Sequence, residues 1–152
     1  MKKNKKTFSE KSTNSEKRVL DALIENSRQS SREIAKKTNL STATVIKKIN
    51  EMKEKGIIRG FSAKVDCEKL GFDFPAIIEI RVAKGKLMEV ENKIAKEKEV
   101  KAVYDITGHF DAAILADFRK RKDLDVFIKK LQKMDFVERT ETKIILNKVK
   151  EE

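Results

Sequence analysis

Residues 30–61 read SSREIAKKTNLSTATVIKKINEMKEKGIIRGF, and this stretch decides the fold of the first half of the chain. Ser30 is followed three residues later by Glu33, which is the spacing of a capping box, so a helix is predicted to begin at Ser31. The Glu33 carboxylate would also face the positive end of that helix. A tight turn is predicted at residues 38–40, where the helix ends.

A second helix is predicted between Ser41, a favoured N-cap residue, and Gly56, which ends it in a left-handed conformation. Its apolar residues recur at spacings of four and three and form one buried stripe, made of Val45, Ile49 and Met52. Residues 57–65 then predict a wing hairpin or a connecting strand. Two short capped helices around a tight turn, followed by such a segment, indicate a winged helix-turn-helix, a module that binds DNA.

The face of the second helix opposite this stripe is the predicted DNA-reading surface. At about 100° per residue, its members point away from the core, and its leading positions would enter a major groove. Together with the start of the preceding helix, the candidate DNA contacts are Ser31, Arg32, Ser41, Thr42, Ala43, Thr44, Ile46, Lys47, Lys48 and Asn50. The alternative interpretation of the same residues is an ordinary solvated helix surface.

The charge of the chain is concentrated in its first half. Residues 1–64 contain 17 basic and 7 acidic residues, a net charge of +10, whereas residues 65–152 contain 19 and 18, a net charge of +1. Such a surplus is expected where a protein neutralises phosphates. The distribution therefore favours DNA binding over a solvated surface, and it indicates a different role for the second half.

Composition argues against several other classes of protein. No run of about 18 apolar residues is present, and the basic residues 2–6 are not followed by an apolar stretch, so neither a membrane span nor a secretory signal is predicted. The protein is expected to be cytoplasmic. Its single cysteine, Cys67, cannot form an internal disulfide, and one histidine offers no metal cluster, so no cofactor is predicted.

The chain divides into a tail, two domains and a short connection. Residues 1–12 are basic and lack apolar periodicity, which predicts a flexible tail. Thr13 and Glu16 form another capping box, and the helix that they open completes a winged helix-turn-helix over residues 13–60. Residues 61–71 are predicted to be a linker strand and hinge.

From residue 72 the pattern alternates between strand-like and helix-like blocks. The predicted order is a strand at 75–82, a helix at 87–98, strands at 100–106 and 111–118, a helix near 124–131 and a last strand at 137–149. This βαββαβ order predicts a ferredoxin-like domain over residues 72–152, which makes the whole chain α+β. Helices would cover one sheet face, and the other face, only half polar along the last strand, is expected to mediate dimerisation.

Five groups of residues occur in the same order as in a known family. They are Leu40-Ser41 through Gly56-Ile57-Ile58-Arg59-Gly60-Phe61, Val65-Asp66, Leu70-Gly71, Thr107-Gly108-His109-Phe110-Asp111 and Val137-Glu138-Arg139-Thr140-Glu141-Thr142. On these motifs the sequence resembles the leucine-responsive regulatory protein and asparagine-synthetase regulator (Lrp/AsnC) family of transcription factors. The resemblance implies a sequence-specific DNA-binding regulator, a homodimer that often assembles further into octamers, and in many members an amino-acid effector bound between dimers.

The same resemblance implies an effector site in the turn between the second and third strands of the regulatory domain. The matching positions are Thr107, Gly108, His109 and Asp111. A carboxylate such as Asp111 can pair the ammonium group of an amino acid, and exposed backbone amides near Gly108 can receive its carboxylate. The alternative is that Asp111 only caps the hairpin, Gly108 only supplies its backbone angles, and His109 is only a turn residue.

The sequence departs from the family at the DNA-reading helix. Members usually carry arginines around the positions held here by Lys47, Lys48, Asn50 and Glu51. Lysine contacts phosphate well, but it reads guanine less rigidly than a bidentate guanidinium does.

Two other functions are left open by the sequence. Siroheme decarboxylases have a similar architecture, and their chemistry needs a general acid with a pKa near neutrality. The one histidine of this sequence, His109, falls in an exposed-looking turn, which disfavours that class. A lysine-rich architectural protein that coats DNA would also explain the basic helix and tail.

Overall fold

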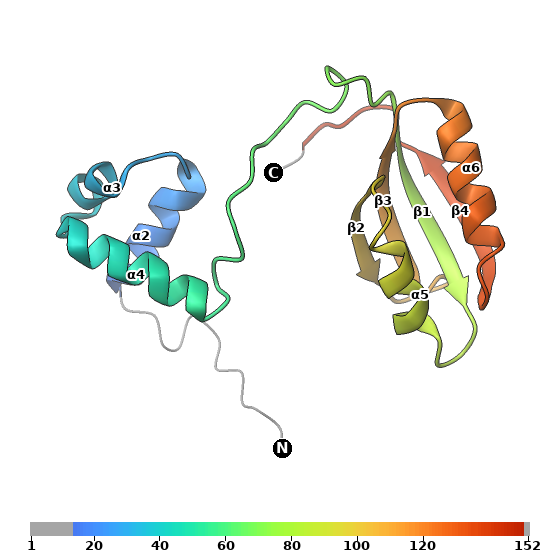
Figure 1. Cartoon of the computed structure of the whole chain (residues 1–152), viewed down its shortest axis with the longest axis horizontal. Coiled ribbons are helices and arrows are strands. Elements are labelled where there is room, and N and C mark those ends of the chain that lie inside the picture. The colour runs from blue at the N-terminus through green and yellow to red at the C-terminus, as the bar shows by residue number, and fades with distance from the viewer. Residues whose placement is uncertain (1–13, 151–152) are drawn as a thin grey trace. The chain divides into compact units, whose positions relative to one another are not determined.

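The computed structural model describes residues 14–150 of the chain and contains two compact units, which divide between Lys64 and Val65 (Figure 1). The predicted tail at residues 1–12 and the predicted cap at Thr13 lie outside the described residues. The described part of the first unit is helical, and the second unit combines helices with a sheet.

The N-terminal unit packs its helices α2 (Asn14–Glu25), α3 (Ser31–Thr38) and α4 (Thr42–Glu54) around one apolar core. The buried side chains of this core are Val19, Ala22, Leu23, Ile34, Ala35, Val45, Met52 and Ile58. The predicted stripe on α4 is therefore confirmed, with Ile49 packing against the core at its margin. Because each helix is short, this shared burial supplies most of its stability.

Both predicted N-caps are present in the structure. Ser30 Oγ accepts a hydrogen bond from the Glu33 amide at 3.3 Å, and the Glu33 carboxylate accepts one from the Ser30 amide at 2.6 Å. The bond from the Ser30 amide is the main cause that holds the pKa of Glu33 below its usual value, and the Ser30 hydroxyl lowers it further. Ser41 Oγ likewise accepts from the Thr44 amide at 3.1 Å, so α4 begins where the sequence predicts.

The end of α4 also follows the prediction. Gly56 has a φ of 69°, the left-handed conformation that a residue with a Cβ atom adopts at a cost. Its amide donates to the Lys53 carbonyl at 2.9 Å, and the Ile57 amide donates to the Met52 carbonyl at 2.9 Å. These two bonds form a Schellman motif, which satisfies carbonyls that the helix end leaves free.

Residues 57–65, where the sequence predicts a wing hairpin or a connecting strand, follow α4 as a non-helical segment. Within the described residues, positions 55–73 contain no strand. Ile58 is buried in the N-terminal core and Ile57 packs against it, so the start of this segment serves the core. Among the described residues, the rest of this segment pairs with no strand of the sheet.

The C-terminal unit has the predicted βαββαβ order. Its elements are β1 (Phe74–Val82), α5 (Leu87–Ile94), β2 (Val100–Asp105), β3 (Ala112–Phe118), α6 (Arg121–Gln132) and β4 (Val137–Ile144). The strands form one four-stranded antiparallel sheet in the order β2-β3-β1-β4. This is the ferredoxin-like arrangement, so the predicted α+β fold class is confirmed.

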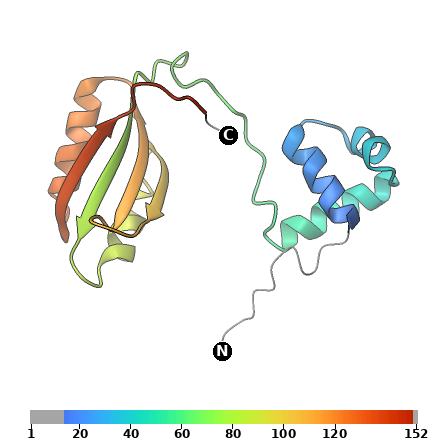
Figure 2. The ribbon, with the colours of Figure 1, turned by 180° about the vertical axis from the view of Figure 1, so that it is seen from behind.

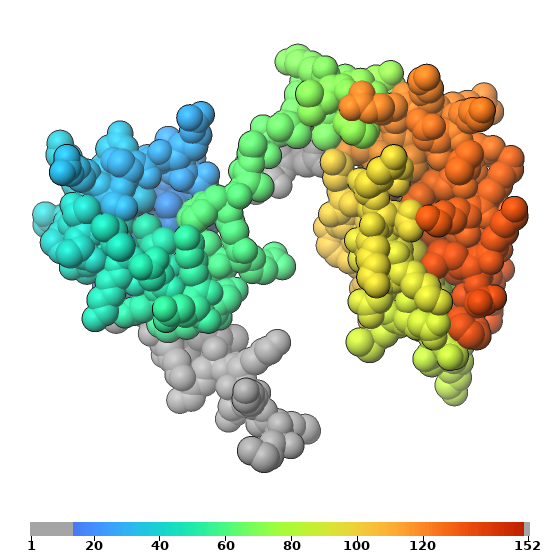
Figure 3. Space-filling model, in the orientation of Figure 1, coloured from blue at the N-terminus to red at the C-terminus, as the bar shows by residue number. Residues whose placement is uncertain are grey.

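Helices α5 and α6 lie on one side of this sheet and leave the other side open (Figures 1 and 2). Their side chains cover the sheet in the space-filling view, α5 in yellow and α6 in orange (Figure 3). Alternate residues of β1 and β3 point into the core beneath them, including Ile78, Ile80 and Ile114, all fully buried. The intervening residues, such as Ile77 and Glu79, line the open face.

The last strand ends earlier than predicted, at Ile144 rather than near residue 149. The Ile145 amide still donates to the Pro75 carbonyl at 2.9 Å, but the chain then leaves β4. Lys148 Nζ lies 3.8 Å from the buried carboxylate of Asp117 on β3, two strands away. This ion pair joins the segment after β4 to β3.

The second half of the predicted linker packs against the C-terminal unit. The Phe72 amide closes a turn by donating to the Cys67 carbonyl at 2.9 Å. Arg119 donates from Nη1 to the Leu70 carbonyl at 2.8 Å, and its guanidinium lies 4.4 Å from the centre of the Phe72 ring. These contacts anchor residues 67–72 at the end of β3.

Candidate nucleic-acid interface and effector site

The exposed face of α4 is the candidate nucleic-acid interface. Ala43, Ile46, Lys47 and Asn50 are exposed, and the side chain of Lys47 keeps 77% of its surface in contact with solvent. Thr42, Thr44 and Lys48 are half-buried on the flanks of this face. The structure thus brings eight of the ten candidate DNA contacts, including the cap Ser41, onto one helix. Ser31 and Arg32 stand apart at the start of α3.

Two of these candidates, Ser41 and Thr44, form the N-terminal cap of α4. Ser41 Oγ caps α4 and also lies 2.8 Å from Thr44 Oγ1, within hydrogen-bond distance. Their hydroxyls hold the helix start in place and are less available to a base edge. The outward-facing positions left for base contacts are Ala43, Ile46, Lys47 and Asn50.

The charge on this face is weakly compensated. Lys47 Nζ lies 4.0 Å from a carboxylate oxygen of Glu51, one turn further along the helix, and the Glu51 side chain is 36% exposed. Exposed pairs at this spacing contribute about 0.3–0.5 kcal/mol, so Lys47 can turn to a phosphate at small cost. Arg32 is exposed at the beginning of α3, where the helix dipole adds to its attraction for an anion.

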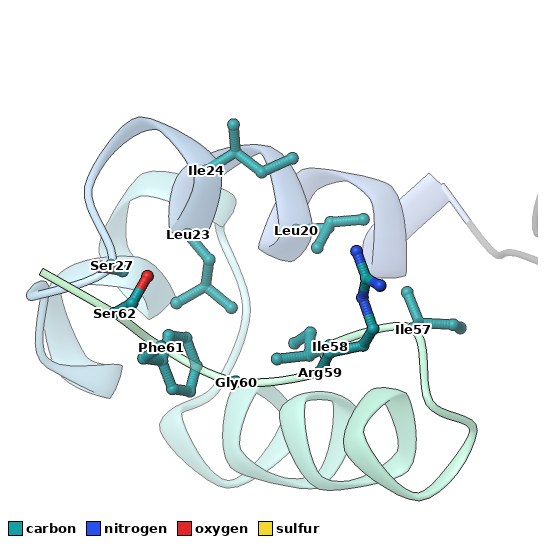
Figure 4. A pocket seen from close by; sticks show the side chains of 10 residues that line it. All are labelled: Leu20, Leu23, Ile24, Ser27, Ile57, Ile58, Arg59, Gly60, Phe61 and Ser62. Atoms are coloured by element: carbon teal, nitrogen blue, oxygen red, sulfur yellow. The ribbon is translucent and has the colours of Figure 1, made fainter. Parts of the chain in front are cut away.

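A groove of about 680 Å³ lies on the opposite side of α4, between α2 and the chain that follows α4 (Figure 4). Its lining is mostly apolar and consists of Leu20, Leu23, Ile24, Ser27, Ile57, Ile58, Arg59, Gly60, Phe61 and Ser62. Lys53 Nζ lies 5.2 Å from the centre of the Phe61 ring and covers one edge of the segment. The groove therefore continues the N-terminal core and is separate from the candidate interface.

The candidate effector turn connects β2 to β3. Gly108 has a φ of 123°, a conformation that side chains with a Cβ atom rarely adopt, and Thr107 and His109 on either side of it are exposed. Asp111 Oδ2 accepts a hydrogen bond from the Val82 amide at 2.8 Å, and the Asp111 amide donates to the Ile80 carbonyl at 2.9 Å. Asp111 therefore ties the turn to the end of β1.

A hollow of about 310 Å³ lies beside this turn on the open face of the sheet. Its lining consists of Glu79, Ile106, Thr107, His109, Phe110, Glu141 and Lys143. Lys143 binds Glu79 and lies 3.3 Å from a carboxylate oxygen of Glu141. The hydrogen bond to Glu79 is the main cause that raises the pKa of Lys143.

Only some of the effector-site residues predicted from the sequence line this hollow. Thr107 and His109 line it, whereas Gly108 and Asp111 do not. The charged groups that do line it, Glu79, Glu141 and Lys143, were missed. The alternation of residues along β4 places Glu141 and Lys143 on one face. That Glu141 lies opposite Glu79 and Lys143 opposite Ile77 depends on strand register, which a single sequence does not reveal.

Residues 14–150 contain no group of three or more His, Cys, Asp or Glu side chains that could hold a metal ion, and none of their helices is long and apolar enough to cross a membrane. Cys67 is partly buried, and burial raises the pKa of its thiol, which disfavours the reactive thiolate.

Both units of the chain match models of known protein families. The model described as winged helix-turn-helix DNA-binding matches residues 13–59, and the model described as Lrp/AsnC ligand binding domain matches residues 75–152. The chain belongs to the Lrp/AsnC family. This Lrp/AsnC protein is accordingly a helix-turn-helix transcriptional regulator with a DNA-binding domain and a family-type ligand-binding domain.

Individual relatives agree with this assignment. An uncharacterized HTH-type transcriptional regulator of Pyrococcus furiosus is 42% identical over 137 residues, which cover 90% of this Lrp/AsnC chain and 93% of the relative. The structure of Escherichia coli AsnC is 30% identical, with a TM-score of 0.83 over 93% of this chain and 96% of that one. A Neisseria meningitidis regulator solved in complex with L-Met is 21% identical and shares the fold, with a TM-score of 0.83 over 92% and 93%.

Proposed function

We propose that this protein is a sequence-specific transcriptional regulator that binds DNA as a dimer or a multiple of dimers and responds to an amino-acid effector. The observation that carries this proposal is the exposed face of α4, where Ala43, Ile46, Lys47 and Asn50 project from a helix capped at both ends. A helix that is already ordered in this way can enter a major groove without the entropy cost of folding on binding.

DNA recognition divides between two elements. Lys47 and Asn50 stand where a recognition helix meets base edges, whereas Arg32 at the start of α3 is placed to contact the phosphate backbone. The net charge of +10 in residues 1–64 supports strong electrostatic attraction to DNA.

The open sheet face supports pairing between two copies of the chain. Ile77 is 37% exposed and Tyr104 is 57% exposed on this face, beside the half-buried Leu115. Apolar side chains in this arrangement gain stability when a second sheet covers them. Pairing through a two-fold axis would present two helix-turn-helix units to an inverted repeat.

The effector proposal rests on the hollow beside the turn at residues 107–110. An amino acid brings an ammonium and a carboxylate, and the hollow contains both complementary charges, Glu79 and Glu141 against Lys143. The exposed amides around Gly108 offer a second place for the carboxylate. Binding of L-Met by a regulator with the same fold supports this class of ligand.

In-vitro selection of bound sequences by the full chain, with and without a panel of amino acids, tests all three parts. The expected result is an inverted repeat with half-sites about 10 bp apart, whose affinity changes with one or a few amino acids. Uniform coating of DNA with no selected sequence would contradict specific regulation and indicate an architectural protein. A Soret shift on addition of a haem precursor would indicate the enzyme class instead.

A further inference from the structure

We propose that α4 reads A·T base pairs, with Ile46 and Ala43 contacting thymine methyl groups and Asn50 contacting adenine. This inference rests on the proposed DNA-binding function and names the class of base sequence that the site selects.

The position of Ile46 is the first observation. Its side chain is 46% exposed on the face of α4 that points away from the N-terminal core, and it is not among the apolar residues that pack against that core. Ile49, which belongs to the buried stripe of α4, does pack against the core. A large apolar side chain on a DNA-facing surface gains stability when it covers a methyl group, and thymine carries the only methyl in the major groove of unmodified DNA.

The side-chain amide of Asn50, on the same face, also favours A·T pairs. Asn50 is exposed, and the structure gives its amide no hydrogen-bond partner among residues 14–150, so both its donor and its acceptor are available. A side-chain amide matches the N6 and N7 atoms of adenine as a bidentate pair.

Arginine is missing from this face. The bidentate contact to guanine is made best by arginine, and the sequence of α4, TATVIKKINEMKE, contains none. Lys47 is a point charge that lies near Glu51, and the hydroxyls of Ser41 and Thr44 are engaged with the helix start. Apart from Lys47, whose ammonium can contact a phosphate or a base edge, the outward side chains of this face are those that suit A·T pairs.

The spacing of these side chains fits neighbouring base pairs. Ala43, Ile46 and Asn50 follow one another at intervals of three and four residues and share one side of the helix. At 1.5 Å per residue they span about 10 Å, which corresponds to about three base-pair steps along the groove. One half-site would thus contain adjacent A·T pairs under this face.

The test changes one chemical group of one base at a time in the DNA. In the duplex that the full chain selects, each thymine is replaced in turn by deoxyuridine, which lacks the methyl group, and affinity is measured for wild type, Ile46→Ala and Ile46→Val. The affinity of the wild-type protein should fall about fourfold when deoxyuridine replaces one or two particular thymines of each half-site. Ile46→Ala should bind the unmodified duplex more weakly and be indifferent to deoxyuridine at one of them, with Ile46→Val between the two. Replacement of adenine by 7-deazaadenine should likewise weaken wild type but not Asn50→Ala.

Ile24→Ala is the matched control, because Ile24 is 74% exposed on α2 and lies outside the candidate interface. It should keep the full sensitivity to deoxyuridine. Binding that survives every deoxyuridine substitution, or selected half-sites made of G·C pairs, would overturn this inference and leave DNA-binding regulation in place. Absence of binding to any selected duplex would overturn both proposals.

Discussion

Asp111 Oδ2 accepts a 2.8 Å hydrogen bond from the backbone amide of Val82, where the register between β1 and β4 shifts after Arg81. The shift leaves this amide in need of a partner, and the carboxylate supplies one. A residue that the family resemblance assigns to an effector therefore also has a structural task.

We expect Asp111→Ala to lower the free energy of unfolding by about 1–3 kcal/mol, because the half-buried Val82 amide would lose its acceptor. Asp111→Asn keeps an acceptor oxygen but removes the charge, so it should recover most of this loss. Urea unfolding of the two variants measures the difference. Equal stability of wild type and Asp111→Ala would contradict the structural role.

Effector binding should appear as a rise in the melting temperature with one or a few of the twenty amino acids. A ligand at 100 times its dissociation constant stabilises the folded state by about 2.7 kcal/mol. The rise should be reduced in Asp111→Asn if that carboxylate also pairs the ligand ammonium, and it should be reduced in Glu141→Gln if the hollow binds it.

Glu138→Gln is the control for the effector measurement. Glu138 is exposed on β4, the strand that carries Glu141, and it does not line the hollow. It should retain the full response. A response that persists in both Asp111→Asn and Glu141→Gln would place the ligand elsewhere.

DNA affinity should respond differently to Arg32→Ala and Lys47→Ala. Loss of a phosphate contact at Arg32 should weaken all sequences alike and reduce the slope of log affinity against log salt by about 0.9 per contact. Lys47→Ala should weaken the selected site most. Titrations at several salt concentrations distinguish the two, with Lys84→Ala, an exposed position on the second unit, as the control. Unchanged binding after both substitutions would exclude the assigned face.

Assembly should depend on the open sheet face. Light scattering of wild type at micromolar concentration should give a dimer or a multiple of dimers. Ile77→Lys places a charge among the apolar residues of this face and should shift the mass toward the monomer. Met88→Lys is the control, since Met88 is 75% exposed on α5, on the other side of the sheet. A monomeric wild type would contradict the model.

The cap of α3 predicts a pH effect of definite sign. Because the pKa of Glu33 is lowered in the folded state, its contribution is present above the ordinary value of 4.5 and is lost as the pH falls through the lower folded value. Glu33→Gln should therefore remove part of the acid sensitivity of unfolding without changing its direction. Thermal melts between pH 3 and 7 check this, and identical acid profiles would count against the capping interaction.

The sequence by itself determined the elements that depend on near neighbours. The capping box at Ser30 and Glu33, the cap at Ser41 and the left-handed Gly56 join atoms within a few residues, so their geometry follows from local spacing. The apolar periodicities likewise predicted the βαββαβ order, because burial of one face requires a regular repeat.

Tertiary structure decided what joins distant parts of the chain. Register alone brings Lys143 beside Glu79, 64 residues away, and so creates the charged hollow near the effector turn. The ion pair between Lys148 and Asp117 joins the segment after β4 to β3, and the segment after Ile58 pairs with no strand among the described residues. A single sequence does not contain these pairings, because each depends on which strands become neighbours once the core is packed.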